Sequence, residues 1–261
     1  GIDWRTAGIE HAREVRDLLG GDYYVDYADD NFADGKKVGL GDIIAYHNET
    51  TVDWFGAFLQ GQYDTEKINL YGMGGVSTIG YTYKDFFSVE KELVEADAIT
   101  TFQVKGGGRY NLDDRLSAFA NVGYVQKPPI LDNVIDYDGN VSTNPDNEKF
   151  TSFEVGGEYG SESVAIKGSY YNTQWNDRNL TKSVTTGQGD SGDTDIIYLT
   201  GVNQSHSGVE VESKIALHEM VDLDLSVSVG DWYFDGDAKG DYTEMEYNDD
   251  NQIIGQTSTE Y

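Results

Sequence analysis

The sequence of 261 residues carries 47 Asp and Glu against 18 Lys and Arg, a formal net charge of −29, which excludes the basic surface that nucleic-acid binding requires. It has no cysteine, which excludes disulfides and thiolate metal sites, and no apolar run long enough for a membrane-spanning helix. Its 31 Gly, 19 Tyr and 10 Phe favour strands and turns over helices.

Apolar and polar residues alternate along most of the chain, which predicts β-strands with one apolar and one polar face. An opening strand is expected within 2–17, although residues 10–19 would also suit one face of a short helix. Further strands are predicted, in chain order, at 52–63, 67–83, 102–112, 115–126, 152–159, 164–170, 209–217 and 221–229. The expected count is therefore about nine.

Four short turns divide these strands at nearly regular intervals. They are Asp64-Thr65-Glu66, Asp113-Asp114, Gly160-Ser161-Glu162 and His218-Glu219. Between successive turns, two strands are joined at their far end by a long, acidic, glycine-rich loop. Tight turns at one end and long loops at the other are typical of a transmembrane β-barrel with antiparallel, up-and-down strands.

Aromatic residues lie eight positions apart on two of the apolar faces. Phe102 and Tyr110 form one such pair, and Phe55 and Tyr63 form the other. Rings at both edges of an apolar band match the interfacial girdles of membrane proteins. The same faces are rich in glycine, whereas a sandwich core needs large branched side chains. The alternative is a soluble or surface-anchored all-β binding module, such as an adhesin, which would not depend on detergent.

The polar faces of the strands carry charges of both signs, which in a barrel would line the lumen. The lumen-lining candidates are Lys105, Arg109, Glu154, Glu158, Lys167, Glu210, Glu212 and Lys214, together with Asp222 and Asp224. Mixed charges on neighbouring strands can pair along the wall, so structural ion pairs are the alternative to direct contact with a solute.

The segments between the strands hold acids and aromatics. The acids gather in 22–34, 90–97 and 235–250, where they would either be solvated or bind divalent cations. The candidates for ligand contact in external loops are Tyr23, Tyr24, Tyr27, Trp175 and Trp232, with Tyr233 beside the last. Such rings could stack on a sugar or a catecholate, or belong to the girdle.

No motif for catalysis or for a cofactor is present. Asp136-Tyr137-Asp138-Gly139-Asn140 resembles part of a calcium loop but has Gly139 at a ligand position and no closing acid, so an Asp-Gly turn is expected. The four histidines are far apart, and Gly106-Gly107-Gly108 lies inside a strand, where it allows close packing or curvature. An enzyme using paired carboxylates is a third hypothesis, but no acid pair stands out. We therefore predict no catalytic residue, no metal site and no cofactor.

Several blocks resemble the late barrel strands of TonB-dependent outer-membrane receptors, in the same order. In chain order they are Asp3-Trp4-Arg5, Glu10-His11, Arg13–Gly21, Arg109–Tyr124, Lys127-Pro128-Pro129-Ile130, Asn147-Glu148-Lys149, Ser152–Gly156, Tyr170–Arg178 and Gly208–Glu212. Together they touch most of residues 1–235 and are moderately specific as a set.

The resemblance implies a 22-stranded barrel closed by an N-terminal plug, on which TonB pulls to admit a scarce solute. Residues 1–261 are then expected to form part of one barrel domain, with the plug and the closing C-terminal strands elsewhere in a longer protein. The expected function is uptake of a siderophore, glycan or peptide without chemistry of the protein's own, at the bacterial outer membrane. The expected partners are membrane lipid, the TonB complex through the plug and a small nutrient, and a surface lipoprotein is a further candidate partner.

Overall fold

The computed structural model describes residues 1–89, 93–135, 139–142, 145–186, 193–218, 220–237, 239–247 and 253–260. This part of the chain contains nine long strands, in agreement with the expected number. They are β1 (Ile2–Glu14), β4 (Ile43–Asp64), β5 (Ile68–Asp85), β7 (Ile99–Asn111), β8 (Leu116–Lys127), β9 (Glu148–Gly160), β10 (Val164–Thr186), β11 (Asp193–His218) and β12 (Val221–Phe234).

Shorter elements lie between and after the long strands. They are β2 (Tyr24–Asp26), β3 (Lys36–Val38), β6 (Leu93–Glu95), the 3₁₀ helix η1 (Leu131–Asn133), β13 (Lys239–Tyr247) and β14 (Ile253–Glu260). Residues 10–19, which were ambiguous in the sequence, continue β1 as far as Glu14 and then leave regular structure. β13 and β14 were not predicted.

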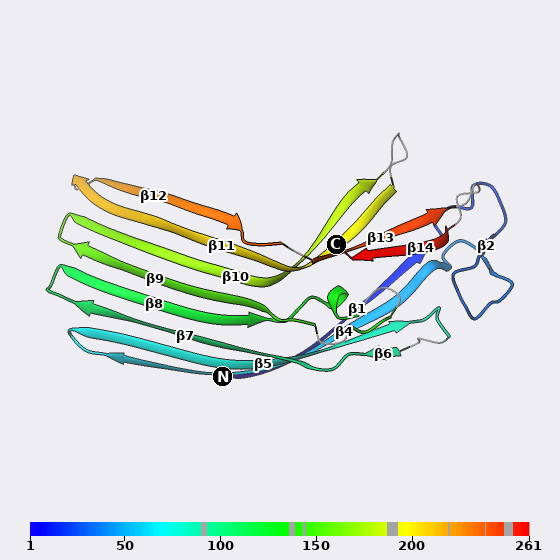
Figure 1. Ribbon diagram of the computed structural model, residues 1–261, viewed down its shortest axis with the longest axis horizontal. Coiled ribbons are helices and arrows are strands. Elements are labelled where there is room, and N and C mark those ends of the chain that lie inside the picture. The colour runs from blue at the N-terminus through cyan, green and yellow to red at the C-terminus, as the bar shows by residue number, and fades with distance from the viewer. Residues whose placement is uncertain are drawn as a thin grey trace. The chain divides into compact units, whose positions relative to one another are not determined.

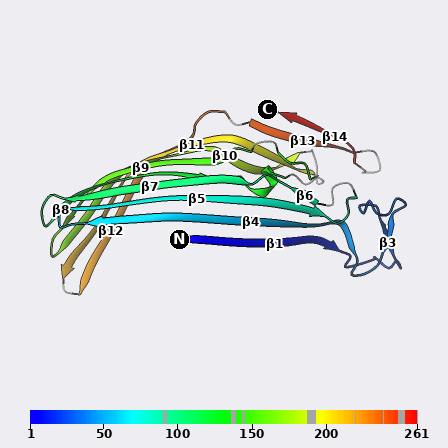
Figure 2. The same ribbon diagram turned by 90° about the horizontal axis from the view of Figure 1, so that it is seen from below.

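The strands follow one another in the sheet almost in chain order, β1-β4-β5-β7-β8-β9-β10-β11, as an up-and-down barrel wall requires. Every register that the structure describes is antiparallel, including those of β8 with β9 and of β9 with β10. Besides β10, β11 pairs with two further strands: its residues 204–218 pair with β12, and its residues 197–200 pair with β13. Figures 1 and 2 show β8 to β11 side by side.

Side-chain hydrogen bonds close the tight turns, for the reason that their residue types predict. The Asp113 carboxylate accepts the backbone N–H of Arg115 and of Leu116, both at 2.8 Å. The hydroxyls of Thr65 and Ser161 accept the N–H groups of the residues three positions further on, at 2.9 and 3.2 Å. These turns lie at one end of the strands, on the left of Figure 1.

A bulge marks the far half of the β10–β11 hairpin. The register of β10 against β11 shifts on both sides of Arg178, where Asp177 takes a φ of +56° and Gly201 of β11 a φ of +69°. The hairpin continues beyond the bulge to Thr186, although the sequence predicted a strand only as far as residue 170. In Figure 1 this part bends away from β9.

The chain divides into two compact units, which are described separately. Unit 1 comprises residues 1–57, 76–100 and 128–145, and unit 2 comprises 58–75, 101–127 and 146–261. Unit 1 has a small apolar core of Tyr81, Tyr83, Ala96, Val134 and Ile135, on which the segment around η1 packs. The Tyr81 hydroxyl donates to the backbone oxygen of Pro129 at 2.8 Å, which fixes this segment to β5.

The apolar faces of the strands in unit 2 are not buried against a second layer. Val104, Val122 and Val229 remain 56%, 62% and 70% exposed, and Phe102 stacks on Tyr124 of the neighbouring strand with 5.2 Å between ring centroids. A soluble sandwich would cover these side chains, whereas a lipid-facing wall leaves them outward.

Candidate functional site

Charged side chains of unit 2 share the face of the sheet opposite the apolar one. The register places Glu158 of β9 opposite Lys167 of β10, and Lys167 opposite Glu212 of β11. It also places Lys214 of β11 opposite Asp224 of β12. Residues opposite each other project to the same side, so these charges form one continuous polar face.

Ion pairs connect this face across the strands. Arg109 of β7 reaches over β8 to Glu158 of β9, with 2.8 Å between Nη1 and Oε2. Lys167 lies 3.8 Å from a carboxylate oxygen of Glu154 and 5.0 Å from the centre of the Phe119 ring. Because the paired groups are all partly exposed, each pair is worth about 0.2–1 kcal/mol. Their effect is to order the polar face.

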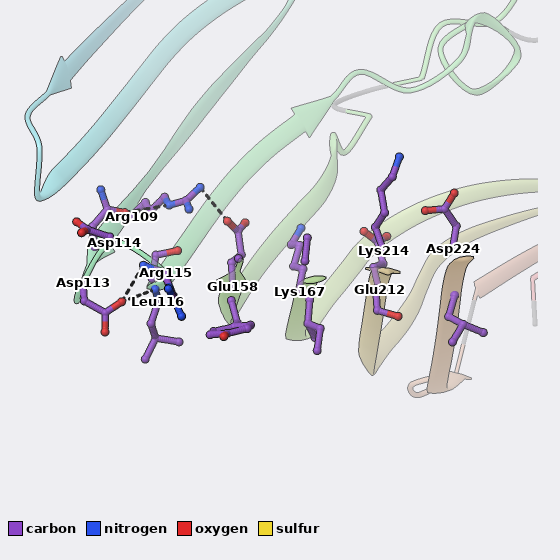
Figure 3. A pocket seen from close by; sticks show the side chains of 18 of the residues that line it. Arg109, Asp113, Asp114, Arg115, Leu116, Glu158, Lys167, Glu212, Lys214 and Asp224 are labelled. Carbon is purple, nitrogen blue, oxygen red and sulfur yellow. Dashed lines mark hydrogen bonds and ion pairs between the residues drawn. The ribbon is translucent and has the colours of Figure 1, made fainter. Parts of the chain in front are cut away.

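A cavity of about 730 Å³ lies on unit 2 at the end that carries the tight turns. It is lined by charges of both signs, among them Arg109, Glu158, Lys214 and Asp224. Figure 3 shows these four side chains extending to one side of the strands and Leu116 to the other. The wall therefore separates a charged surface from an apolar one within a single layer.

A second cavity, of about 700 Å³, lies further along the strands of unit 2. Polar groups in its lining are hydrogen-bonded in series: the Tyr71 hydroxyl donates to Asn121 at 3.2 Å, and the Asn121 amide donates to Glu154 at 3.0 Å. Lys105 lines the same cavity and has no hydrogen bond or ion pair with any described residue. The cavity thus presents a free cation beside an ordered polar network.

Glycines allow the aromatic rings of this face to lie against the backbone. A Cβ on Gly107 would overlap the Asn121 amide and approach the Tyr71 ring to 2.6 Å. A Cβ on Gly156 would approach the Phe119 ring to 2.5 Å. The expectation that Gly107 permits close packing inside a strand is confirmed.

A buried acid connects β8, β9 and β10 at the end of the strands opposite the tight turns. Glu148 is 0% exposed, and its carboxylate accepts hydrogen bonds from Lys127 Nζ at 2.8 Å and from Trp175 Nε1 at 2.9 Å. Phe150 lies 4.5 Å from the Trp175 ring, and the Arg178 guanidinium lies 3.9 Å from it. The position of the Trp175 indole is therefore fixed both by the hydrogen bond of its N–H group and by the contacts of its ring.

The bulge next to this cluster is fixed by polar contacts. Asp177 accepts a hydrogen bond from Lys149 Nζ at 2.7 Å, and its backbone N–H donates to Asn203 at 3.1 Å. A left-handed conformation at a residue other than glycine is costly, so these contacts have to hold it.

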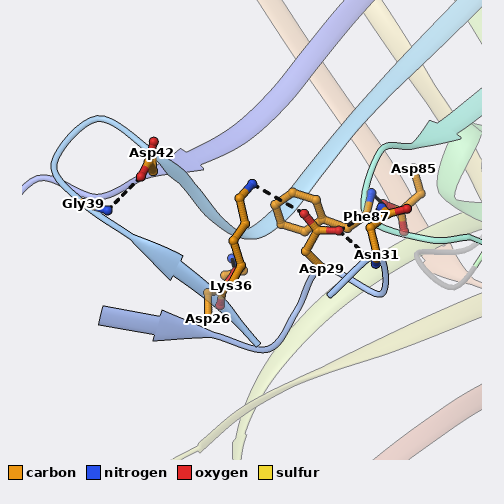
Figure 4. Close-up of polar contacts among 9 residues, drawn as sticks. Asp26, Asp29, Asn31, Lys36, Gly39, Asp42, Asp85 and Phe87 are labelled. Carbon is orange, nitrogen blue, oxygen red and sulfur yellow. Dashed lines mark hydrogen bonds and ion pairs between the residues drawn. The ribbon is translucent and has the colours of Figure 1, made fainter. Parts of the chain in front are cut away.

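The acidic segment 22–34 folds on itself in unit 1. Asp29 is buried, accepts hydrogen bonds from Asn31 and lies 3.5 Å from Lys36 Nζ (Figure 4). Asp26 is also buried, and its carboxylate accepts the backbone N–H of Ala45 at 3.2 Å. Within the described ranges no group of three or more His, Asp or Glu is arranged to hold a metal ion. These buried carboxylates therefore fix the backbone and Lys36.

No helix in the described part of the chain is long and apolar enough to cross a membrane. The comparison with curated proteins gave no match. A family model described as "TonB dependent receptor-like, beta-barrel" matches residues 2–259. The chain belongs to the TonB-dependent receptors.

Solved structures of this family share the fold. The copper transporter OprC aligns with a TM-score of 0.55 at 16% identity, over 93% of this chain and 41% of OprC. The siderophore receptor PirA from Pseudomonas aeruginosa aligns at 13% identity over 77% of this chain and 46% of PirA, with a TM-score of 0.49. This chain therefore spans less than half the length of either receptor.

Membership of the family places the TonB-dependent receptor chain in the outer membrane of Gram-negative bacteria. In outer-membrane barrels the short turns are periplasmic and the long loops extracellular. The turn at Asp113 accordingly marks the periplasmic end of unit 2, and the cluster around Glu148 marks its extracellular end.

The five aromatic candidates for ligand contact lie in different settings. Trp175 belongs to β10 and Trp232 to β12, so their placement in loops is wrong. The Trp232 indole donates to the Tyr171 hydroxyl at 3.2 Å. Tyr23 and Tyr27 lie in the segment between β1 and β4, and Tyr24 begins β2 of the same segment. Ligand contact by any of these rings stays a prediction.

Some predicted features fall partly or wholly outside the described residues. These are the Asp136–Asp138 part of the calcium-like loop, Glu219 of the fourth turn, residues 90–92 of the second acidic segment and residues 248–250 of the third. The sequence also left Lys127 and Glu148 of the buried cluster without a role, and likewise Arg13 and Arg16, which line one cavity with Tyr23. Their only signal was membership of the blocks that resemble the family.

Proposed function

We propose that this chain is a section of the wall of a receptor that takes up a scarce nutrient across the outer membrane, with energy from TonB. In this proposal a plug outside residues 1–261 closes the lumen, and TonB acts on that plug. The nutrient is a siderophore, a glycan or a peptide, and the chain performs no chemistry on it. Copper and a siderophore are named for the neighbours OprC and PirA, and the likeness of OprC to this chain extends to the fold alone.

The observation that carries the proposal is the division of unit 2 into two unlike faces. One face exposes valine, leucine and aromatic side chains, which water would not tolerate over so large an area but lipid does. The other face bears ordered ion pairs and two cavities lined by polar groups. The eight predicted lumen-lining residues, from Lys105 to Lys214, share this second face through the register of β7 to β11.

The ion pairs along the polar face support a wall that is ordered without the solute. Arg109 and Glu158 bind each other, as do Lys167 and Glu154, so these four charges would act first on the structure of the wall. Lys105 differs from these four residues, because it lines the second cavity, of about 700 Å³, without a partner among the described residues. We propose that it contacts an anionic group of the solute, or of the plug, within the lumen.

The test uses the full-length protein in its native host. A strain lacking it is expected to grow poorly when the nutrient is limiting, and growth is expected to return with the wild-type gene only if TonB is present. In parallel, the protein should be extracted only by detergent and should migrate differently on a gel before and after boiling. Recovery of a monodisperse protein without detergent would favour an adhesin, and growth independent of TonB would overturn the proposed energy source.

A further inference from the structure

A cavity of about 620 Å³ lies in unit 1, where β1 leads into the segment that contains β2 and β3. Its lining includes two arginines and three tyrosines: Arg13, Arg16, Tyr23, Tyr24 and Tyr46. It spans the end of β1, the start of the long segment 15–42 and the start of β4, and this segment belongs to the extracellular end by the rule that long loops are extracellular. Its residues are therefore accessible to a solute that arrives from outside.

The backbone around the cavity is held in place without a ligand. Val15 is buried, donates its N–H to Asp42 at 2.9 Å and accepts the N–H of Gly41 at 2.9 Å. Tyr24 is held opposite buried Val38 by the β2–β3 ladder. Such a preorganised site loses little conformational freedom when a ligand binds.

The arginines of this cavity are free to bind an anion. Neither Arg13 nor Arg16 makes a hydrogen bond or ion pair with any other residue that the structure describes. Two acids, Glu14 and Asp17, line the same cavity, and the Asp17 carboxylate accepts the backbone N–H of Leu19 at 2.8 Å. The cavity therefore presents two unpaired guanidinium groups in a chain whose net charge is −29.

Two acids of the segment outside the lining, Asp42 and Asp29, have partners of their own. Asp42 accepts the N–H of Gly39 at 2.7 Å, and Asp29 pairs with Lys36, as Figure 4 shows. The ammonium of Lys37 lies 4.5 Å from the centre of the Tyr23 ring, which adds a third positive charge near the cavity. Three cations, Arg13, Arg16 and Lys37, therefore face the two lining carboxylates of Glu14 and Asp17, which leaves the cavity with a positive balance.

The tyrosines supply flat, accessible surface beside these charges. Tyr23 and Tyr24 are each 54% exposed, and Tyr46 is 47% exposed. Tyrosine rings stack on planar ligands and their hydroxyls donate or accept hydrogen bonds. Guanidinium groups bind carboxylates through two parallel hydrogen bonds.

We propose that this cavity is an extracellular binding site for an anionic aromatic ligand, whose carboxylate binds Arg13 and Arg16 and whose ring packs on Tyr23, Tyr24 and Tyr46. The proposal deepens the proposed function, on which it rests, by naming the chemical class of the solute. It selects the acidic, aromatic members among siderophores and peptides over neutral glycans.

The test compares sodium salicylate with salicylamide, which has nearly the same shape and no carboxylate. Both are titrated at low ionic strength by calorimetry into the full-length protein in detergent. The wild-type protein is expected to bind salicylate at least about tenfold more tightly than salicylamide, the ratio for one hydrogen bond to a charged group. In the double variant R13Q/R16Q the two affinities should differ by less than about twofold, because the anion has lost both partners.

The matched control is Arg5→Gln, which removes the same charge from β1 at a residue paired with Asp3 at 2.8 Å and absent from the cavity. It is expected to keep the preference for salicylate, and the shift in gel migration on heating verifies that each variant is folded. Equal affinities for the two probes in the wild type, no binding of salicylate, or an unchanged preference in R13Q/R16Q would each overturn the site. Growth that still depends on the receptor and on TonB would show that the proposed function had survived that failure.

Discussion

Replacing Glu148 by alanine removes a carboxylate that connects the extracellular ends of β8, β9 and β10. Glu148 is fully buried, and the substitution leaves Lys127 Nζ and Trp175 Nε1 without the acceptor that each contacts within 3 Å. We expect a clear loss of stability, because a buried donor that loses its acceptor keeps the desolvation cost.

The magnitude follows from the exposure of the two partners. Breaking a buried pair costs about 3–5 kcal/mol, but the Lys127 side chain is 46% exposed and can return to water, so its share falls to about 1 kcal/mol. The indole N–H of Trp175 is less able to do so and contributes about 1–3 kcal/mol. The expected decrease in the free energy of unfolding is therefore about 2–4 kcal/mol.

Two further variants separate charge from hydrogen bonding. Glu148→Gln keeps an acceptor for Trp175 and loses the charge, so about half of the decrease is expected. Glu158→Ala breaks the pair with Arg109, in which both side chains are partly exposed, and should cost about 0.2–1 kcal/mol. The assay is urea unfolding of the full-length protein folded into lipid vesicles. A Glu148→Ala effect no larger than that of Glu158→Ala would refute the reasoning.

Two other substitutions probe the packing of the wall. Gly107→Ala should destabilise the wall by about 1–3 kcal/mol in the same unfolding assay, because the new methyl group meets the Tyr71 ring. The neighbouring substitution Gly106→Ala, whose new methyl group has its nearest contact at 3.4 Å, should cost less than about 1 kcal/mol. Asp177→Ala should cost more than Asp177→Asn, since asparagine tolerates the φ of +56° and alanine does not. Equal effects within either pair would contradict the packing or the strain, respectively.

The alternation of the sequence was enough to predict the existence of the nine long strands, though not their full length, and the side of the sheet that their alternating residues face. Val209 and Val211 project away from Glu210 and Glu212 because a strand has a period of two residues, whatever lies around it. The turns at Asp113 and Ser161 were equally predictable, since the hydrogen bonds that close them are local.

Features that depend on several strands at once were not predictable in this way. Arg109 binds Glu158 two strands away, which requires the register of β7, β8 and β9 together. The hairpin beyond Asp177 was missed because the bulge interrupts the alternation that marks a strand. The contacts of Trp175 with Glu148 and Arg178 likewise arise only when β9 and β10 pair.

The central claim is that one face of this wall meets lipid and the other an aqueous lumen, and a pair of neighbouring substitutions in β12 tests it most directly. Val227 lies opposite Val211 on the apolar face, and Ser228 lies opposite Glu210 on the polar face. The measurement is the free energy of unfolding of full-length V227R and S228R in lipid vesicles. The account predicts a loss of about 2–4 kcal/mol for V227R, because arginine is costly within the bilayer, and less than about 1 kcal/mol for S228R, whose arginine can pair with Glu210. Equal losses for the two variants, or a larger loss for S228R, would contradict it.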